Sequence, residues 1–178
     1  PRMSRAMAAG EFGLAREQSH LNQRIRGRTL GLVGFGNSAK LVARRAQGFG
    51  LRVIATRRHQ LAADPEAAAL GVTMTDLETV LRESDYLSLH LPLLPETYHL
   101  LDEAALRKMK PGAFLINTSR GALVDEAALV QVLREGRLAG AGLDTFEQIN
   151  VFTPDEAPPD HPLLGLDTVI LTPHVAAG

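Results

Sequence analysis

One glycine-rich stretch of the chain has the residue types and the spacing that suit an anionic ligand. It reads G-x-G-x-x-A at Gly34, Gly36 and Ala39. Gly34 permits a tight turn out of a strand, Gly36 lets the backbone approach a pyrophosphate, and Ala39 lets a following helix pack closely. The amides of Asn37 and Ser38 would then open a helix whose N-terminus favours an anion. We predict a dinucleotide-binding turn, although the motif alone also fits a glycine-rich turn without a ligand.

The end of the next strand along the chain bears on which dinucleotide would bind. An NAD site places Asp or Glu there, to accept hydrogen bonds from the adenosine ribose. This chain reads Ala-Thr-Arg-Arg, with Arg57 at the acidic position and Arg58 after it. A guanidinium binds a 2′-phosphate that a carboxylate would repel. We therefore predict NADP(H) over NAD(H), with NAD still possible; two solvated surface charges are the alternative.

The elements that position these residues follow from short apolar runs at regular intervals. Seven such runs predict strands, at residues 29–33, 52–56, 72–74, 86–90, 113–117, 139–143 and 168–171. Most are apolar on both faces, as is typical of buried parallel strands. Helical patterns lie between them, at residues 38–48, 75–82, 102–109 and 125–134. This alternation predicts an α/β fold with a doubly wound parallel sheet of the Rossmann type.

Cap-forming residues mark several predicted helix ends. Thr75 and Glu78 match a capping box, Asp125 matches an N-cap, and Gly136 matches a helix terminator. One long irregular stretch remains at residues 148–166, with four prolines, and we predict that it has a functional role.

Composition excludes several classes of protein. The 178 residues carry a formal net charge of −1, which does not favour nucleic acid or an anionic membrane, and there is no cysteine for disulfides or thiolate metal sites. No run approaches the ~18 apolar residues of a membrane span, so we expect a cytoplasmic protein. Because the chain begins at Pro1 and stops at Gly178 directly after a strand-like run, we interpret it as part of a longer protein.

Longer motifs resemble those of the D-isomer-specific 2-hydroxyacid dehydrogenases. They are SLHLPLLPET at residues 88–97, KPGAFLINTSRG at 110–121, VDEAAL at 124–129, AGLDTFE at 141–147 and LTPH at 171–174. The resemblance runs from about Arg26 to Gly178. That family combines a discontinuous substrate domain with an inserted cofactor domain. The resemblance implies that residues 29–178 form the NAD(P)-binding domain, that residues 1–28 are an N-terminal helix and linker, and that the substrate domain is absent.

The resemblance also implies catalytic roles. Arg120 would bind the substrate carboxylate and polarise the 2-oxo group, since a guanidinium offers two parallel donors and stays charged. His174 would be the general acid/base, because the pKa of imidazole lies near working pH. Asp144 would hold the nicotinamide carboxamide. Taken singly, they also fit a surface arginine, an ordinary histidine and a loop cap, but all three follow predicted strands, where open α/β sheets bind ligands.

Further positions would line the cofactor if the resemblance holds. They are Leu91, Pro92, Thr118, Ser119, Ala176 and Ala177. The remaining histidines are expected to be structural or at the surface; they are His20, His59, His90, His99 and His161.

One position departs from the family pattern. The family places a glutamate five residues after the aspartate of the Leu-Asp-x-Phe run, where it pairs with the histidine and raises its pKa. This chain has Ile149 there, which accepts no hydrogen bond. Three explanations stay open: Glu147 takes over the role, the activity has shifted, or the domain binds cofactor without turnover.

Two classes of function follow. The first is an oxidoreductase that reduces a small 2-oxo acid of the glyoxylate or hydroxypyruvate type to the D-2-hydroxy acid. The second is a dinucleotide-binding regulatory module with little or no turnover, similar to the corepressor relatives of the family. A predicted N-terminal helix at residues 1–14 has an apolar stripe, which in this family suggests packing on a partner subunit; we therefore expect a homodimer. The stripe consists of Met3, Ala6, Met7 and Phe12.

Overall fold

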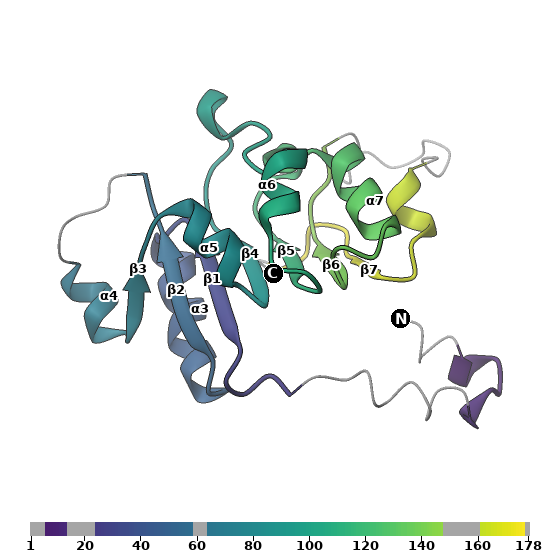
Figure 1. Cartoon of the computed structure of the whole chain (residues 1–178), viewed down its shortest axis with the longest axis horizontal. Helices are drawn as coiled ribbons and strands as arrows, with labels where there is room; N and C mark the ends of the chain where they lie inside the picture. Colours follow the sequence, from purple (N-terminus) through teal and green to yellow (C-terminus); the bar gives the residue numbers. More distant parts are fainter. Residues whose placement is uncertain (1–5, 14–23, 59–63, 148–160, 177–178) are drawn as a thin grey trace.

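The fold is built on one parallel sheet. The computed structural model describes residues 6–13, 24–58, 64–147 and 161–176. Within these residues seven strands pair in the order β3-β2-β1-β4-β5-β6-β7, and every pairing is parallel. The chain therefore winds outward from β1 in both directions, which confirms the predicted doubly wound Rossmann-type fold (Figure 1).

The strands agree closely with those predicted. Their bounds are Thr29–Val33 (β1), Arg52–Thr56 (β2), Val72–Met74 (β3), Tyr86–Leu89 (β4), Phe114–Asn117 (β5), Gly140–Leu143 (β6) and Val169–Leu171 (β7). The first three match the prediction, and each of the others is one residue shorter. All five residues of β1 are buried, since it lies between β2 and β4 with helices over both faces.

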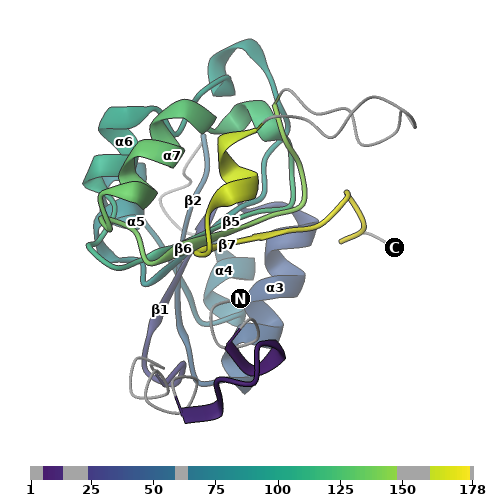
Figure 2. The same ribbon diagram turned by 90° about the vertical axis from the view of Figure 1, so that its right-hand side faces the viewer.

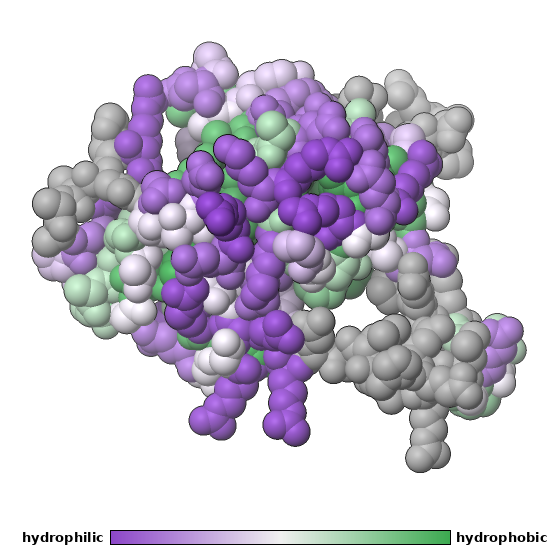
Figure 3. Space-filling model, viewed as in Figure 1, coloured by the Kyte–Doolittle hydropathy of each residue, from purple (hydrophilic) through white to green (hydrophobic). Residues whose placement is uncertain are grey.

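Helices cover the two faces of the sheet in separate groups. On one face lie Asn37–Gly48 (α3) and Pro65–Ala69 (α4); on the other lie Leu77–Glu83 (α5), Glu103–Lys108 (α6) and Glu126–Arg134 (α7) (Figure 2). Each group has its own apolar core against the sheet. Short 3-10 turns lie in three of the connections after strands, at Pro95–Thr97 (η2), Gly121–Leu123 (η3) and Pro162–Gly165 (η4). The surface over α5, α6 and α7 is mostly hydrophilic (Figure 3), and it carries exposed ion pairs such as that of Arg107 with Glu135.

The capping predictions hold for α7 but not for α5. Asp125 caps α7 by accepting a hydrogen bond from the Ala128 amide at 3.0 Å, and Gly136 follows the helix with φ of 70°. The predicted capping box of Thr75 is wrong, because Asp76 caps α5 and accepts from the Thr79 amide at 2.7 Å. The Thr75 amide instead donates to the carbonyl of Ala55 at 2.8 Å, so this residue continues the pairing of the sheet.

The predicted N-terminal helix is interrupted within the described residues. Of residues 1–14 the structure describes 6–13, where helical turns at residues 6–8 and 12–13 are separated at Gly10, with φ of 79°. The Glu11 amide donates to the Ala6 carbonyl and the Gly10 amide to that of Met7, a pairing that ends a helix. Met3 lies outside the described residues. In the described part of the chain, no helix has the length and apolar character needed to cross a bilayer.

Candidate functional site

The glycine turn after β1 is tight at Gly34 and open at Gly36. Gly34 has φ of 93°, and a Cβ there would lie 2.3 Å from the His90 carbonyl oxygen, so only glycine fits. Gly36 is the N-cap of α3 in extended conformation, and among the described residues no atom lies within 4 Å of the Cβ that it lacks. The backbone there is open to a ligand.

The first turn of α3 leaves its amides available to that ligand. No side chain of the described residues caps this helix, so the leading N–H groups, including those of Asn37 and Ser38, have no helical partner. Such a helix start favours an anion. Ala39 is fully buried with Ala43 and Ala46 on one face of α3. These small residues let the helix pack closely on the sheet, as predicted for Ala39.

A cavity of about 610 Å³ adjoins the glycine turn. It brings together predicted residues from three parts of the chain: Gly34, Gly36, Arg57, Arg58, Leu91 and Pro92. Its remaining walls are largely apolar, with Phe35, Leu77 and Leu94 among them. An apolar cavity with a few convergent polar groups is the usual form of a small-molecule site.

The two arginines at the end of β2 are held by carboxylates. Arg57 Nη2 lies 2.9 Å from Asp64 Oδ2, with only 27% of the arginine side chain and 6% of the aspartate side chain exposed. Arg58 forms an ion pair with Glu96, in which both side chains are exposed. Arg57 is therefore a positioned side chain and not simply a solvated charge.

His90 lies beneath the glycine turn and joins two hydroxyl groups. Its Nδ1 is 2.6 Å from Ser38 Oγ, and its Nε2 is 3.0 Å from Ser88 Oγ. Burial lowers the pKa of His90 to about 4, so the ring is neutral near pH 7. His90 was expected to be structural or at the surface; the sequence signal for its site is that it follows β4 directly, two residues after Ser88.

A second group of predicted residues follows β5, β6 and β7. Arg120 comes three residues after β5, Asp144 directly after β6, and His174 three residues after β7. Because carboxyl ends of parallel strands meet at one edge of a sheet, these residues share the edge that also carries the glycine turn.

Asn117, which the sequence analysis did not single out, organises the turn that carries Arg120. It is 1% exposed; its Oδ1 accepts from the Ser119 amide at 3.0 Å, and its Nδ2 donates to the Arg120 carbonyl at 2.8 Å. Ser119 Oγ in turn donates to the Leu89 carbonyl at 2.7 Å. Thr118 and Ser119, which are predicted to contact the cofactor, lie in this turn. A buried amide at the end of an apolar strand was the available sequence signal.

Asp144 binds the loop that carries His174. Its carboxylate accepts hydrogen bonds from Thr172 Oγ1, from the Val175 amide at 3.0 Å and from the Ala176 amide at 2.9 Å. Burial by itself raises the pKa of Asp144, but these hydrogen bonds outweigh it and hold the pKa below its ordinary value. His174, with φ of 59°, has its Nδ1 3.9 Å from Asp144 Oδ2. Contact of Asp144 with a nicotinamide carboxamide stays a prediction.

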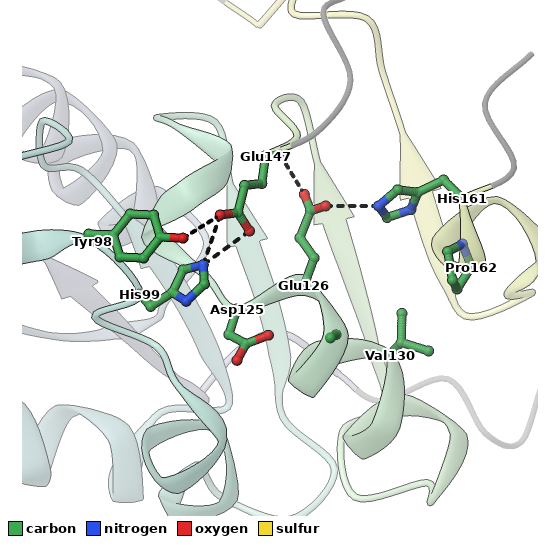
Figure 4. A pocket seen from close by; sticks show the side chains of 9 residues that line it. Tyr98, His99, Asp125, Glu126, Val130, Glu147, His161 and Pro162 are labelled. Carbon is green, nitrogen blue, oxygen red and sulfur yellow. Dashed lines mark hydrogen bonds and ion pairs between the residues drawn. The ribbon is translucent and has the colours of Figure 1, made fainter.

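Glu147 points to a different histidine from the one expected. Its carboxylate accepts from Tyr98 Oη at 2.9 Å and pairs with His99 Nε2 at 3.0 Å (Figure 4). The backbone leaves little freedom here, because a Cβ at Gly121 would lie 1.9 Å from the Phe146 carbonyl carbon. The structure thus gives no support to a pairing of Glu147 with His174. Ile149 and Ala177 lie outside the described residues.

Tyr98, His99 and Glu147 line a pocket of about 510 Å³, which also has apolar walls at Val130 and Pro162 (Figure 4). Glu126, 6% exposed, accepts from the Glu147 amide at 2.9 Å through Oε1, and its Oε2 lies 2.9 Å from His161 Nε2. One buried carboxylate thereby binds the residues on either side of the segment 148–160. Among the described residues, no group of three or more His, Asp or Glu side chains is arranged to hold a metal ion.

The fold and the glycine turn together define a dinucleotide-binding domain of the Rossmann type. More particularly, the chain belongs to the family described as D-isomer specific 2-hydroxyacid dehydrogenase, NAD binding domain, which matches residues 1–176.

Several similar proteins carry the names of reductases. The chain is 49% identical over 156 residues to a glyoxylate reductase of Korarchaeum cryptofilum, covering 86% of this chain and 44% of the relative. It is 39% identical over 178 residues to a hydroxypyruvate reductase of Thermotoga maritima, covering 98% and 54%. The chain spans about half the length of the relatives that it matches.

Solved structures of dehydrogenases share this fold. The apo form of D-mandelate dehydrogenase from Rhodotorula graminis superimposes with a TM-score of 0.84 and 34% identity, covering 97% of this chain and 50% of that one. D-lactate dehydrogenase with NAD+ from Lactobacillus jensenii gives a TM-score of 0.85 and 33% identity, covering 97% and 52%.

Proposed function

We propose that this chain is the cofactor-binding part of an oxidoreductase that reduces a small 2-oxo acid to the D-2-hydroxy acid. The observation that carries the proposal is the placement of Arg120 and His174 at the edge of the sheet where the glycine turn opens. Relatives named glyoxylate reductase and hydroxypyruvate reductase support a substrate of that type. The substrate domain, in this proposal, lies outside the chain, and residues 29–178 form the cofactor domain after a linker at 1–28.

Arg120 and His174 have different tasks in the proposed reaction: one binds the substrate and the other transfers a proton. When bound, NAD(P)H supplies the hydride that reaches the 2-oxo carbon. Arg120 binds the substrate carboxylate and polarises the carbonyl, because its guanidinium presents parallel donors with a fixed charge. His174 donates a proton to the carbonyl oxygen, so that hydride and proton together give the hydroxyl group, and it takes the proton back in oxidation.

NADP(H) is the preferred cofactor in this proposal, with NAD(H) as a weaker ligand. The Gly34–Ala39 turn would hold the pyrophosphate, and Arg57 and Arg58 line the cavity beside it, where a 2′-phosphate would meet a guanidinium. Titration of the purified protein with NADPH and with NADH tests this preference. Tighter binding of NADH would refute it.

The reaction itself is tested with the substrate domain present. We expect steady oxidation of NADPH with glyoxylate or hydroxypyruvate, and loss of this oxidation in an Arg120→Gln variant that still binds cofactor. An intact rate in that variant would remove Arg120 from the reaction.

A second candidate is a regulatory module that binds dinucleotide without turnover. In the family a glutamate pairs with the catalytic histidine. Here Glu147 contacts His99 and not His174, which favours this second candidate. Cofactor binding without reduction of any 2-oxo acid, measured with both domains, would select this candidate.

We also propose a homodimer. Met7 and Phe12 are 52% and 64% exposed near the N-terminus, and a partner subunit would cover them. Light scattering on the purified protein tests the oligomeric state.

A further inference from the structure

Arg57, which would bind the 2′-phosphate, forms an ion pair with the carboxylate of Asp64, and that carboxylate is fixed in place. Asp64 is the N-cap of α4, and its Oδ1 accepts hydrogen bonds from the amides of Glu66 and Ala67, both at 3.1 Å. Its Oδ2 faces Arg57 Nη2 at 2.9 Å. Since one oxygen is engaged by the helix, the carboxylate cannot turn away when another anion approaches Arg57.

The contact between these two groups is ionic in character. Asp64 Oδ2 is buried and accepts no well-directed hydrogen bond from the described residues, although the Arg57 guanidinium lies close. The aspartate side chain is 6% exposed, so water and salt screen its charge weakly. The neighbouring pair differs, because the side chains of Arg58 and Glu96 are 68% and 42% exposed and are open to screening.

The two members of the buried pair also differ in their access to the cofactor cavity. Arg57 lines it together with Gly34, Gly36 and Thr56, whereas Asp64 does not. A phosphate in the cavity therefore reaches the guanidinium but also meets the field of the carboxylate bound to it. Attraction of the 2′-phosphate by Arg57 is offset by its repulsion from Asp64. NADH has no 2′-phosphate, so both effects on its binding are smaller.

We propose that Asp64 is a specificity-determining residue that keeps the preference for NADPH over NADH small. This inference rests on the proposed binding of a 2′-phosphate by Arg57. The negative charge of Asp64 offsets part of the positive charge that Arg57 presents to a 2′-phosphate. In this proposal the protein therefore uses both dinucleotides.

An Asp64→Asn variant isolates the charge, because asparagine caps helices about as well as aspartate. We expect the dissociation constant of NADPH to fall about fivefold and that of NADH to stay within about twofold, as measured by titrating the purified protein. The ratio of the two constants is the readout. A rise of more than about twofold in the preference for NADPH supports the inference; a smaller rise, or a shift towards NADH, overturns it.

Matched variants separate this result from other effects. Asp102→Asn removes the charge of another N-cap aspartate, at α6, and should leave both constants unchanged. If Asp64→Asn does not fold, Asp64→Ser provides a second uncharged cap. Arg57→Gln tests the underlying proposal: if NADPH binding is unaffected, the NADP preference fails, whereas weakened NADPH binding together with an inert Asp64→Asn overturns the Asp64 inference alone.

Discussion

Single residues in the glycine turn have separable tasks. Gly34 and Gly36 both belong to the motif, yet only Gly34 has positive φ and meets neighbouring backbone, while the space beside Gly36 is open among the described residues. The first glycine is required by the fold, whereas the second would serve the ligand in our proposal.

Alanine substitutions at these two positions should therefore have different effects. We expect Gly34→Ala to lower the free energy of unfolding by about 1–3 kcal/mol, because of its φ and of the clash with His90. Gly36→Ala should leave stability nearly unchanged but weaken NADPH binding by about tenfold, since its methyl group occupies the approach to the pyrophosphate. Urea unfolding and cofactor titration measure the two effects, and equal loss of stability in both variants would contradict this division.

His90 should make stability depend on pH. Its pKa is about 4 in the folded chain against 6.5 for an ordinary histidine, so the unfolded chain binds more protons between these values. The contribution, up to about 3 kcal/mol, is present above pH 6.5 and is lost as the pH falls towards 4. His90→Gln should flatten the dependence of unfolding free energy on pH in this window. An unchanged slope would show that another group is responsible.

At the residue scale, the sequence predicted the positions of candidate site residues better than it predicted which side chains contact one another. The placement of the two glycines and Arg57 at one cavity could be predicted, because their types and spacing reflect local backbone and charge; their contacts with a cofactor stay predictions. The partners Asp64 of Arg57 and His99 of Glu147 were not found, because each pair joins residues that only tertiary folding brings together.

At the scale of elements, the connection from β6 to β7 depends on one side chain of α7. Glu126 binds the Glu147 amide and His161, which flank the segment 148–160. A buried carboxylate that loses its partners is costly, and so is a buried partner that loses the carboxylate.

Glu126→Ala should lower the free energy of unfolding by about 1–3 kcal/mol, since it leaves the part-buried Glu147 amide without its acceptor and removes the carboxylate beside His161. Glu126→Gln should cost less, because its amide oxygen still accepts from Glu147. Glu135→Ala, at the exposed end of the same helix, is the matched control and should change stability little. Chemical denaturation of the three variants gives the comparison, and a small effect in Glu126→Ala would mean that the contact is dispensable.

Elements were predictable to the extent that they repeat a pattern. The strands were found to within one residue, because buried parallel strands are continuous apolar runs. Helix α4 was missed, since five residues are too few to show a helical period. The start of α5 was placed too early because Thr75 and Asp76 are both good caps, and only the sheet pairing of Thr75 decides between them.

At the scale of the whole molecule, our proposal places the substrate domain outside this chain, which would leave the cleft with one wall. We expect the chain by itself to bind NADPH and to show no measurable reduction of glyoxylate, because the second wall that would hold the substrate is missing in our proposal. Absorbance of NADPH, followed with and without glyoxylate, measures turnover. Steady oxidation by the chain alone would show that the substrate site is complete here.

The contacts of Glu126 also bear on how such a protein changes over evolutionary time. Because both flanks of residues 148–160 are bound to the same carboxylate, the length of the segment between them is decoupled from the positions of β6 and β7. We expect insertions between Glu147 and His161 to leave the pairing of β6 with β7 unchanged, which would make this position suited to grafting a loop.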